Sequence, residues 1–291
     1  MCDHHPGAET RGGPRNQPQI DTSVRIAYYL SMLTRPPFQT AHDAEGFLLA
    51  VLHVLEGKLD RSKFIVKGGM NLRAWFGSQR YSEDLDLDIV RIEPFALRDV
   101  MDRVLTAPLL RSLLASQRLS LVRVSRPKQT DTTQRWKFEI ASLAGETVPP
   151  IATKLDINRR GADEGAATEP LLAQVRFIHG LPAIVATHYA ASKAIQQKIH
   201  ALAARRDPKA RDVWDLEHLF RTTVGDPRPL PDALARLVPE AIERTLAFTF
   251  EDYRDQVLPF LTEEAREIYT LPQHWDAIRE LVLDRLMGLS P

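Results

Sequence analysis

The sequence predicts an α+β fold with a mixed sheet, followed by an all-helical C-terminal part. Up to about residue 181, strand patterns and helical patterns are both present, whereas beyond Pro182 apolar residues recur only at helical spacing. We therefore predict three segments. They are a disordered tail over residues 1–21, an α+β domain over residues 22–181 and a helical domain over residues 182–291.

Particular patterns predict each element. In the first part, helical spacing predicts helices over residues 41–59, 71–76 and 99–114. Short apolar or alternating runs predict strands over residues 64–66, 85–90, 119–124, 136–140, 153–157 and 175–178, with a loop over 161–170. In the second part, helices are predicted over residues 188–205, 210–222, 232–248 and 275–287.

Composition and charge limit the classes of function. The chain has 38 basic and 38 acidic residues, so it can bind a polyanion only through a local patch. Residues 1–20 lack the apolar run of a signal peptide, and the longest apolar stretch, 46–55, is too short to span a bilayer. The single cysteine, Cys2, excludes a disulfide framework. These features predict a cytoplasmic protein with no membrane partner.

An acidic strand is the first candidate for chemistry. Asp84, Asp86 and Asp88 alternate with aliphatic residues and therefore share one strand face. Three like charges in a row repel one another, and a bound divalent cation would remove that repulsion. Magnesium prefers such carboxylate oxygens and takes one or two of them together with substrate phosphate. The alternative is a solvated edge strand whose charges prevent aggregation.

A glycine turn precedes this strand. Lys67, Gly68 and Gly69 stand where a predicted strand meets a predicted helix. Glycines allow a ligand to approach the backbone closely, and a helix N-terminus offers free N–H groups to an anion. By itself the turn could simply connect the strand to the helix. Together with the acidic strand, it predicts a phosphate-binding turn that faces a metal site.

Two further regions supply candidate groups. Asp156 shares a strand face with Lys154 and could complete a set of three carboxylates for two-metal nucleotidyl transfer, or be an ordinary surface acid. Downstream, a basic helical region contains Lys193, Lys198, Arg205, Arg206, Lys209 and Arg211. Most of these charges can form helical salt bridges, as Arg211 and Asp215 do by spacing. Lys193 and Lys198 could instead face a triphosphate or an RNA backbone.

The order of these motifs resembles a known family. The motifs are Lys67-Gly68-Gly69, Arg80 to Asp86, Lys154-Leu155-Asp156, Lys193, and Arg211 to Leu216. In this order they are similar to the AbiEii/AbiGii toxins, which are DNA polymerase β-like nucleotidyltransferases of abortive-infection and toxin–antitoxin systems. The resemblance covers residues 63–219 and implies a polymerase β-like nucleotidyltransferase core within residues 22–181.

The resemblance implies roles for individual residues. Asp84 and Asp86 would bind Mg²⁺, and Asp88 offers a rival pairing with Asp86. Lys193 and Asp215 match the late lysine and aspartate of the family. The implied catalytic set is Asp84, Asp86, Asp156, Lys193 and Asp215, and the implied nucleotide-binding set is Lys67, Gly68, Gly69, Ser82 and Lys193. Where the family usually has a serine or threonine after the glycine turn, this chain has Met70, and Asn71 is the candidate to replace the missing hydroxyl.

The resemblance also implies substrates and partners. Family members use nucleoside triphosphates, some add nucleotides to the 3′ end of tRNA and so stop translation, and others are linked mainly to GTP binding. An antitoxin encoded nearby controls the toxin. We expect Lys198, Arg205 and Arg206 to contact the RNA acceptor. The alternatives are transfer to a protein or a small molecule, or a non-catalytic module that binds a nucleotide or a partner.

Overall fold

The centre of the protein is a seven-stranded mixed sheet. The computed structural model describes residue 1 and residues 37–142, 149–159, 164–222 and 227–289. The predicted tail over residues 1–21 therefore lies, apart from Met1, outside the described residues. The strands are β1 (Phe64–Lys67), β2 (Asp84–Ile89), β3 (Leu119–Gln129), β4 (Thr133–Ser142), β5 (Ile151–Asn158), β6 (Ala166–Pro170) and β7 (Val185–Tyr189).

The strand order is β3-β4-β5-β2-β1-β7-β6. The pairs β2–β5 and β1–β7 are parallel, and the other neighbouring pairs are antiparallel. Strand β2, with its acidic side chains, thus lies in the interior of the sheet between β1 and β5. This position excludes the edge-strand explanation for its acidic residues, because β2 has a hydrogen-bonded neighbour on each side.

Helices cover one face of the sheet. They are α2 (Pro37–Glu56), α4 (Pro94–Leu105), α5 (Pro108–Ser116) and the short α6 (Ala173–Ile178), and a 3₁₀ turn, η1 (Arg61–Lys63), precedes β1. Phe47 of α2 is fully buried and packs on Phe138 of β4, with ring centroids 5.0 Å apart. Leu85 and Leu87 of β2 belong to the same hydrophobic cluster. Burial of the aliphatic face of β2 leaves its acidic face on the side of the sheet away from α2.

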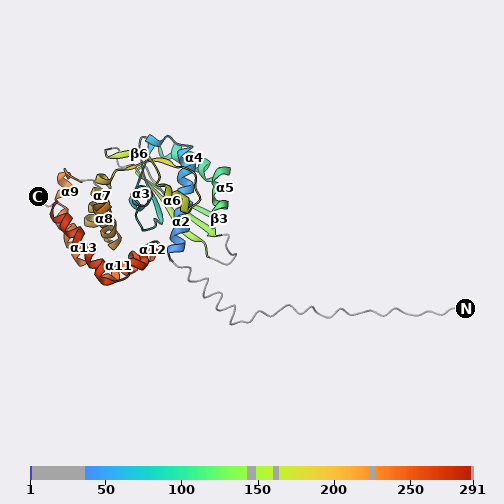
Figure 1. Ribbon diagram of the computed structural model, residues 1–291. Coiled ribbons are helices and arrows are strands. Elements are labelled where there is room, and N and C mark those ends of the chain that lie inside the picture. The colour runs from blue at the N-terminus through green and yellow to red at the C-terminus, as the bar shows by residue number, and fades with distance from the viewer. Residues whose placement is uncertain (2–36, 143–148, 160–163, 223–226, 290–291) are drawn as a thin grey trace. The chain divides into compact units, whose positions relative to one another are not determined.

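The C-terminal part is helical throughout the residues that the structure describes. Its elements are α7 (Ala191–Ala204), α8 (Ala210–Thr222), α9 (Asp232–Ala235), α10 (Val238–Ala247), α11 (Phe250–Gln256), η2 (Leu258–Phe260), α12 (Glu263–Ile268) and α13 (Pro272–Met287). In Figure 1, α9, α13 and α11 form an arc outside α7 and α8. A second hydrophobic cluster, which includes Trp214, Tyr253 and Trp275, holds these helices together.

Helix α3 (Gly68–Phe76) links the two parts. Met70 and Ala74 belong to the cluster on the sheet, whereas Leu72 belongs to the cluster of the C-terminal helices. The turn that begins α3 is therefore held between the sheet and α7–α8. The predicted α+β class with a mixed sheet and a helical C-terminal part is confirmed. The domain boundary at residue 182 stays a prediction.

Several local predictions are wrong. Residues 175–178, predicted as a strand, form most of helix α6, in which Val175 is buried while Phe177 is 66% and Ile178 51% exposed. A short apolar run fits a strand and a helix equally well, and packing decides between them. Two strands were missed: β6, within the predicted loop, and β7, beyond Pro182. Strand β6 is an edge strand that ends in Pro170, and proline is tolerated at an edge.

Prolines divide two of the predicted helices. The helix predicted over residues 99–114 is α4 followed by α5, with Pro108 as the first residue of α5. The helix predicted over residues 232–248 is α9 followed by α10, with Pro239 in the first turn of α10. Proline lacks an N–H group and is favoured in the first turn of a helix. None of the described helices is both long enough and apolar enough to cross a membrane.

Candidate active site

The acidic face of β2 lies beside an acidic residue of β5. Asp84 pairs in register with Lys154, and Asp86 pairs with Asp156. The three carboxylates therefore lie on one sheet face, on two adjacent parallel strands about 4.8 Å apart. The structure brings together Asp84, Asp86 and Asp156, as the predicted site requires.

The glycine turn lies directly against this acidic face. Gly68 has a φ of 70°, and a Cβ built on it would lie only 2.8 Å from Oδ2 of Asp86. A Cβ on Gly69 would lie 3.1 Å from Nη2 of Arg80 and 3.1 Å from Oγ of Ser82. A side chain at Gly68 would fill the space between the start of α3 and Asp86, and one at Gly69 would crowd Arg80 and Ser82.

The environment of Asp86 shifts its pKa upward. Burial raises its pKa, the positive charge of Lys67 lowers it, and the negative charges of Asp84 and Asp156 raise it again, so that the net shift is upward. The cost of burying the negative charge of Asp86 is thus only partly offset by the cations of the protein. A cation close to Asp86 would relieve this cost.

Basic side chains accompany the other two carboxylates. Lys154 Nζ donates to Oδ2 of Asp84 at 2.6 Å. Arg135 forms a two-pronged pair with Asp156, with Nε to Oδ1 at 2.5 Å and Nη2 to Oδ2 at 2.9 Å. Asp156 is therefore less available as a ligand than Asp84 or Asp86, which agrees with the choice of the latter two for the metal.

Asp88 has a different environment from its neighbours on β2. It is buried, forms an ion pair with Lys67 and accepts a hydrogen bond from Tyr189 Oη at 2.8 Å. Both of its oxygens are thereby engaged within the protein. This arrangement favours Asp84 with Asp86 over Asp86 with Asp88 as the pair that is open to a ligand.

The segment between α3 and β2 is held from both sides. Ser82 donates through its Oγ to the carbonyl of Asp84 at 2.9 Å, and its backbone N–H donates to Oε2 of Glu45 at 2.9 Å. Glu45, fully buried on α2, is paired with Arg73 at 3.1 Å and with His179 at 2.9 Å. Burial alone would raise the pKa of Glu45, but Arg73 and His179 lower it below its usual value. The charged Glu45 thus fixes the loop that leads into the acidic strand.

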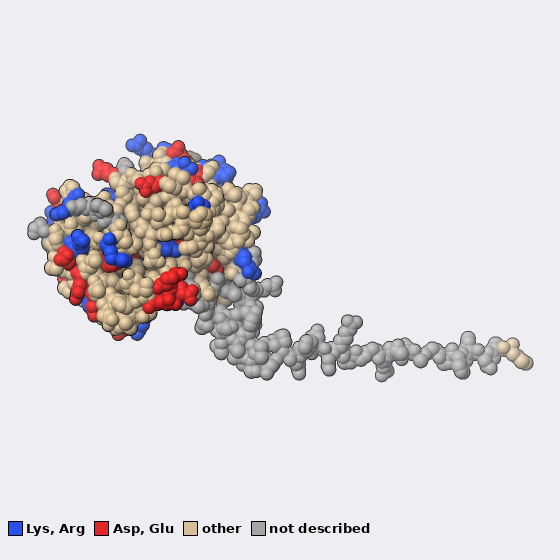
Figure 2. All heavy atoms as spheres, viewed as in Figure 1, with Lys and Arg blue, Asp and Glu red and all other residues tan. Residues whose placement is uncertain are grey.

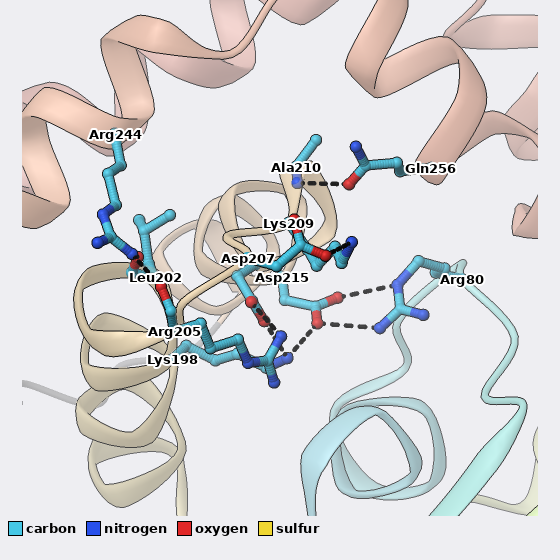
Figure 3. Close-up of polar contacts among 11 residues, drawn as sticks. Arg80, Lys198, Leu202, Arg205, Asp207, Lys209, Ala210, Asp215, Arg244 and Gln256 are labelled. Carbon is cyan, nitrogen blue, oxygen red and sulfur yellow. Dashed lines mark hydrogen bonds and ion pairs between the residues drawn. The ribbon is translucent and has the colours of Figure 1, made fainter.

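A buried ion-pair network joins this loop to the C-terminal helices (Figure 3). Arg80 donates to both oxygens of Asp215 on α8, at 3.1 and 2.9 Å. Lys198 of α7 donates to Asp215 at 2.5 Å and to Asp212 at 3.0 Å. Burial alone would raise the pKa of Asp215, but Arg80 and Lys198 hold it well below its usual range. Asp215 is thus ionised, fully buried and paired with two cations.

Lys198, rather than Lys193, lies at the cleft. A cleft of about 380 Å³ is lined by the glycine turn and α7, including Lys67, Gly68, Asp86, Lys198 and Arg205. Lys193 is not among its lining residues. It packs against Gly165 instead, where an added Cβ would lie 3.1 Å from the Lys193 Cβ. On α7 these two lysines are five residues apart and point in different directions, because five residues do not make a whole number of helical turns.

The predicted RNA-binding cluster is largely neutralised. Arg205 is paired with Asp212 at 2.6 Å, and Lys209 is paired with Asp207. Arg206 is exposed and lies next to Arg205 in the turn after α7. Figure 2 shows basic and acidic side chains in small separate groups on the visible face.

Asn71 does not face the glycine turn. Its Nδ2 donates to the carbonyl of Tyr189 at 2.9 Å, and its Oδ1 lies 3.0 Å from Nδ1 of His188. Met70 is fully buried in the core. The expectation that Asn71 replaces the missing hydroxyl is therefore wrong, because β7, which was not predicted, takes up its side chain. Ser82 supplies the nearest hydroxyl to Gly69 instead.

Sequence reasoning missed three groups that shape the site. Sequence patterns identify Arg80 only as part of a motif and assign no role to Glu45 or Arg135. Arg80 and Glu45 are buried charges whose partners are distant in sequence, so local spacing contains no signal for them. Arg135 could have been found, because it directly precedes the strand predicted over residues 136–140, and a strand extended by one residue would place it on the face opposite buried Trp136.

The comparisons with known proteins agree with this fold. The family model described as "Nucleotidyl transferase AbiEii toxin, Type IV TA system" matches residues 52–285. The comparison with curated proteins gave no match. Among solved structures, JHP933 from Helicobacter pylori has a TM-score of 0.54 at 19% identity, over 85% of this chain and 94% of that chain. The nucleotidyltransferase toxin MenT4 from Mycobacterium tuberculosis has a TM-score of 0.53 at 17% identity, over 92% of this chain and 99% of that chain.

Proposed function

The chain belongs to the AbiEii nucleotidyl transferase toxins, a type IV toxin–antitoxin family, and on this premise we propose that it transfers nucleotides to the 3′ end of tRNA. The donor is a nucleoside triphosphate, the reaction depends on Mg²⁺, and the modified tRNA no longer supports translation. The cognate antitoxin is encoded by a neighbouring gene. The toxin is a nucleotidyltransferase, and the proposal concerns its acceptor, its metal and its effect.

One observation supports the nucleotide site above all. In the cleft, the side chains of Lys67, Lys198 and Arg205 surround Asp86 and the glycine turn. In the protein alone these cations are paired with Asp88, Asp215 and Asp212. A triphosphate carries more negative charge than any one of these carboxylates and can therefore attract the same cations. Gly68 leaves room for a phosphate to approach both the backbone and Asp86. We assign the triphosphate contact to Lys198 in place of Lys193.

Asp84 and Asp86 suit magnesium by their chemistry. They offer carboxylate oxygens on one strand face, and the raised pKa of Asp86 indicates a site that gains from a positive charge. The described residues contain no cluster of three or more His, Cys, Asp or Glu side chains placed to hold a metal. Magnesium would therefore be bound by these two carboxylates and completed by substrate phosphate. When bound, it would neutralise the charge of the triphosphate and stabilise the leaving pyrophosphate.

The protein groups account for the rest of the transfer. The acceptor 3′ oxygen forms a bond to the α-phosphorus of the nucleotide, and the bond from this phosphorus to the bridging oxygen of pyrophosphate breaks. Pyrophosphate leaves with that electron pair, and the hydroxyl proton passes to a carboxylate of the acidic face, where Asp156 lies across from Asp86. Arg80, held by Asp215, keeps the loop that contains Ser82 in place.

The test is direct labelling. Purified protein is incubated with total tRNA, Mg²⁺ and each of the four α-labelled nucleoside triphosphates in turn, and the products are separated by size. We expect one or more nucleotides to label tRNA at its 3′ end. The label should be absent in EDTA and absent with Asp86→Asn. Label on a protein or a small molecule, with none on RNA under any nucleotide, would refute the RNA acceptor and leave the nucleotidyltransferase assignment unchanged.

A further inference from the structure

A second hollow lies over strands β3, β4 and β5 and borders β2 at Asp84. Its volume is about 370 Å³, and its lining includes Asp84, Arg123, Lys137 and Lys154. The nucleotide cleft opens at Asp86 instead and extends toward β1 and α7. The two hollows share no lining residue. Asp84 and Asp86 also line a smaller pocket together with Gly68, Gly69 and Ser82. Asp84 therefore borders both that pocket and the second hollow.

Strand register arranges the cations of this hollow in a row. Asp84 on β2 is opposite Lys154 on β5, and Lys154 is opposite Lys137 on β4. Strands are about 4.8 Å apart, so Lys137 lies about 10 Å from Asp84 along the row. Arg123 on β3 lies beyond it, paired with Glu139 in a solvent-exposed contact of 3.2 Å. Such exposed pairs are weak and exchange readily for a phosphate.

Lys137 is the most available of these cations. Its side chain is exposed because the residues on either side of it, Trp136 and Phe138, point into the core. Within the described part of the chain, Lys137 has no ion-pair partner. By contrast, Lys198 and Arg205 are held by Asp212 and Asp215 on α8. Lys137 can thus contact a phosphate without losing an ion pair, whereas Lys198 and Arg205 already form ion pairs with α8.

We propose that the acceptor RNA strand lies across the open face of β3, β4 and β5, with its terminal ribose at Asp84 and its preceding phosphates at Lys137 and Arg123. The acceptor then approaches Asp84 from strands β3 to β5 and the donor approaches Asp86 from the glycine turn and α7, so that the 3′ hydroxyl meets the nucleotide in the pocket that Asp84 and Asp86 share. This inference rests on the proposed function for the identity of the acceptor. It replaces Arg205 and Arg206 as the principal RNA contacts.

The inference is tested by binding measured apart from catalysis. Fluorescence anisotropy of 5′-labelled tRNA, without nucleotide, is recorded over a salt series for wild type, Lys137→Glu and the control Lys58→Glu. Lys58 is also an exposed lysine, but it lies in the turn after α2, outside both hollows. We expect Lys137→Glu to weaken binding about tenfold and to reduce the slope of log K against log salt by about 0.7, the value of one lost single-strand phosphate contact. Lys58→Glu should behave as wild type.

Nucleotide binding, measured by titration calorimetry, separates this inference from the proposed function. Lys137→Glu should bind nucleoside triphosphate with wild-type affinity while its KM for tRNA in the labelling assay rises. Unchanged tRNA binding by Lys137→Glu, together with a loss in Arg205→Glu, would overturn the open-face site even if tRNA is labelled. Conversely, salt-sensitive tRNA binding that depends on Lys137 without any labelling would support the open face and refute the proposed reaction.

Discussion

Arg80 and Asp215 form a buried two-pronged ion pair that joins the loop before the acidic strand to helix α8. Nε and Nη2 of Arg80 lie 3.1 and 2.9 Å from the two oxygens of Asp215, and the Asp215 side chain is fully buried. Lys198 donates to the same carboxylate. Asp215 therefore positions Arg80 at the glycine turn and Lys198 at the nucleotide cleft. Its effect on the site is through these two side chains.

Asp215→Asn should lower the free energy of unfolding by about 3–5 kcal/mol, because it leaves the buried Arg80 with an uncharged partner and Lys198 with Asp212 as its remaining carboxylate. Urea denaturation at pH 7 measures this change. The matched control is Asp207→Asn, whose side chain is 78% exposed and paired only with Lys209. That change should stay within about 0.5 kcal/mol. Equal effects of the two substitutions would contradict a structural role for Asp215.

The same pair predicts a pH dependence. Because the folded state lowers the pKa of Asp215, its contribution to stability is complete above the unfolded value of about 3.9 and is lost as the pH falls through the lower folded value. The difference in unfolding free energy between wild type and Asp215→Asn should therefore be constant from pH 7 to about pH 5 and shrink below about pH 4. A difference that stays constant down to pH 3 would show that the carboxylate is not held in its ionised form.

Asp86→Asn and Asp88→Asn should change stability in opposite directions. The raised pKa of Asp86 means that its ionised form destabilises the fold above that pKa, so the neutral amide should raise the melting temperature at pH 7. Asp88→Asn removes a charge from the ion pair with Lys67 and should lower the melting temperature. Thermal melts with and without Mg²⁺ test the metal assignment. The shift caused by Mg²⁺ should vanish in Asp86→Asn and persist in Asp88→Asn, and the reverse pattern would favour a metal bound through Asp88.

Gly68→Ala should impair both folding and nucleotide binding. At a φ of 70° an alanine costs about 1–2 kcal/mol, and its Cβ would lie 2.8 Å from Oδ2 of Asp86. The matched control is Gly57→Ala, because Gly57 has no positive φ and its Cβ would meet only a backbone oxygen at 3.6 Å. Calorimetric titration with nucleoside triphosphate should show at least a tenfold (about 1.4 kcal/mol) loss for Gly68→Ala and none for Gly57→Ala. Wild-type affinity in Gly68→Ala would argue against a phosphate at the glycine turn.

Lys198→Met should weaken nucleotide binding much more than Lys193→Met. Lys198 lines the cleft beside Asp86, whereas Lys193 packs against Gly165. Because Lys198→Met also leaves Asp212 and Asp215 short of a partner, its melting temperature should be measured alongside its affinity. Lys198→Arg keeps the charge and should restore most of the stability but less of the affinity, since the guanidinium is larger and planar. A larger loss of affinity in Lys193→Met would reverse the assignment.

Local sequence determined the acidic face, the glycine turn and the order of the two parts. The period-two alternation in residues 84–89 fixes which side chains share a face whatever the strand packs against. Helix α8 has the predicted bounds of residues 210–222, because its helical spacing is a local property of the sequence.

Tertiary structure alone decided which charges meet. Arg80 and Asp215 are 135 residues apart, and they are neighbours because α3 packs at once on the sheet and on the C-terminal helices. The choice of Lys198 over Lys193 depends on which side of α7 faces the glycine turn. The hydrogen bond of Asn71 to the carbonyl of Tyr189, which turns Asn71 away from the glycine turn, depends on the parallel pairing of β7 with β1. Periodicity assigns a side chain to a face of its own element, but the partner across that face is set by the packing of distant segments.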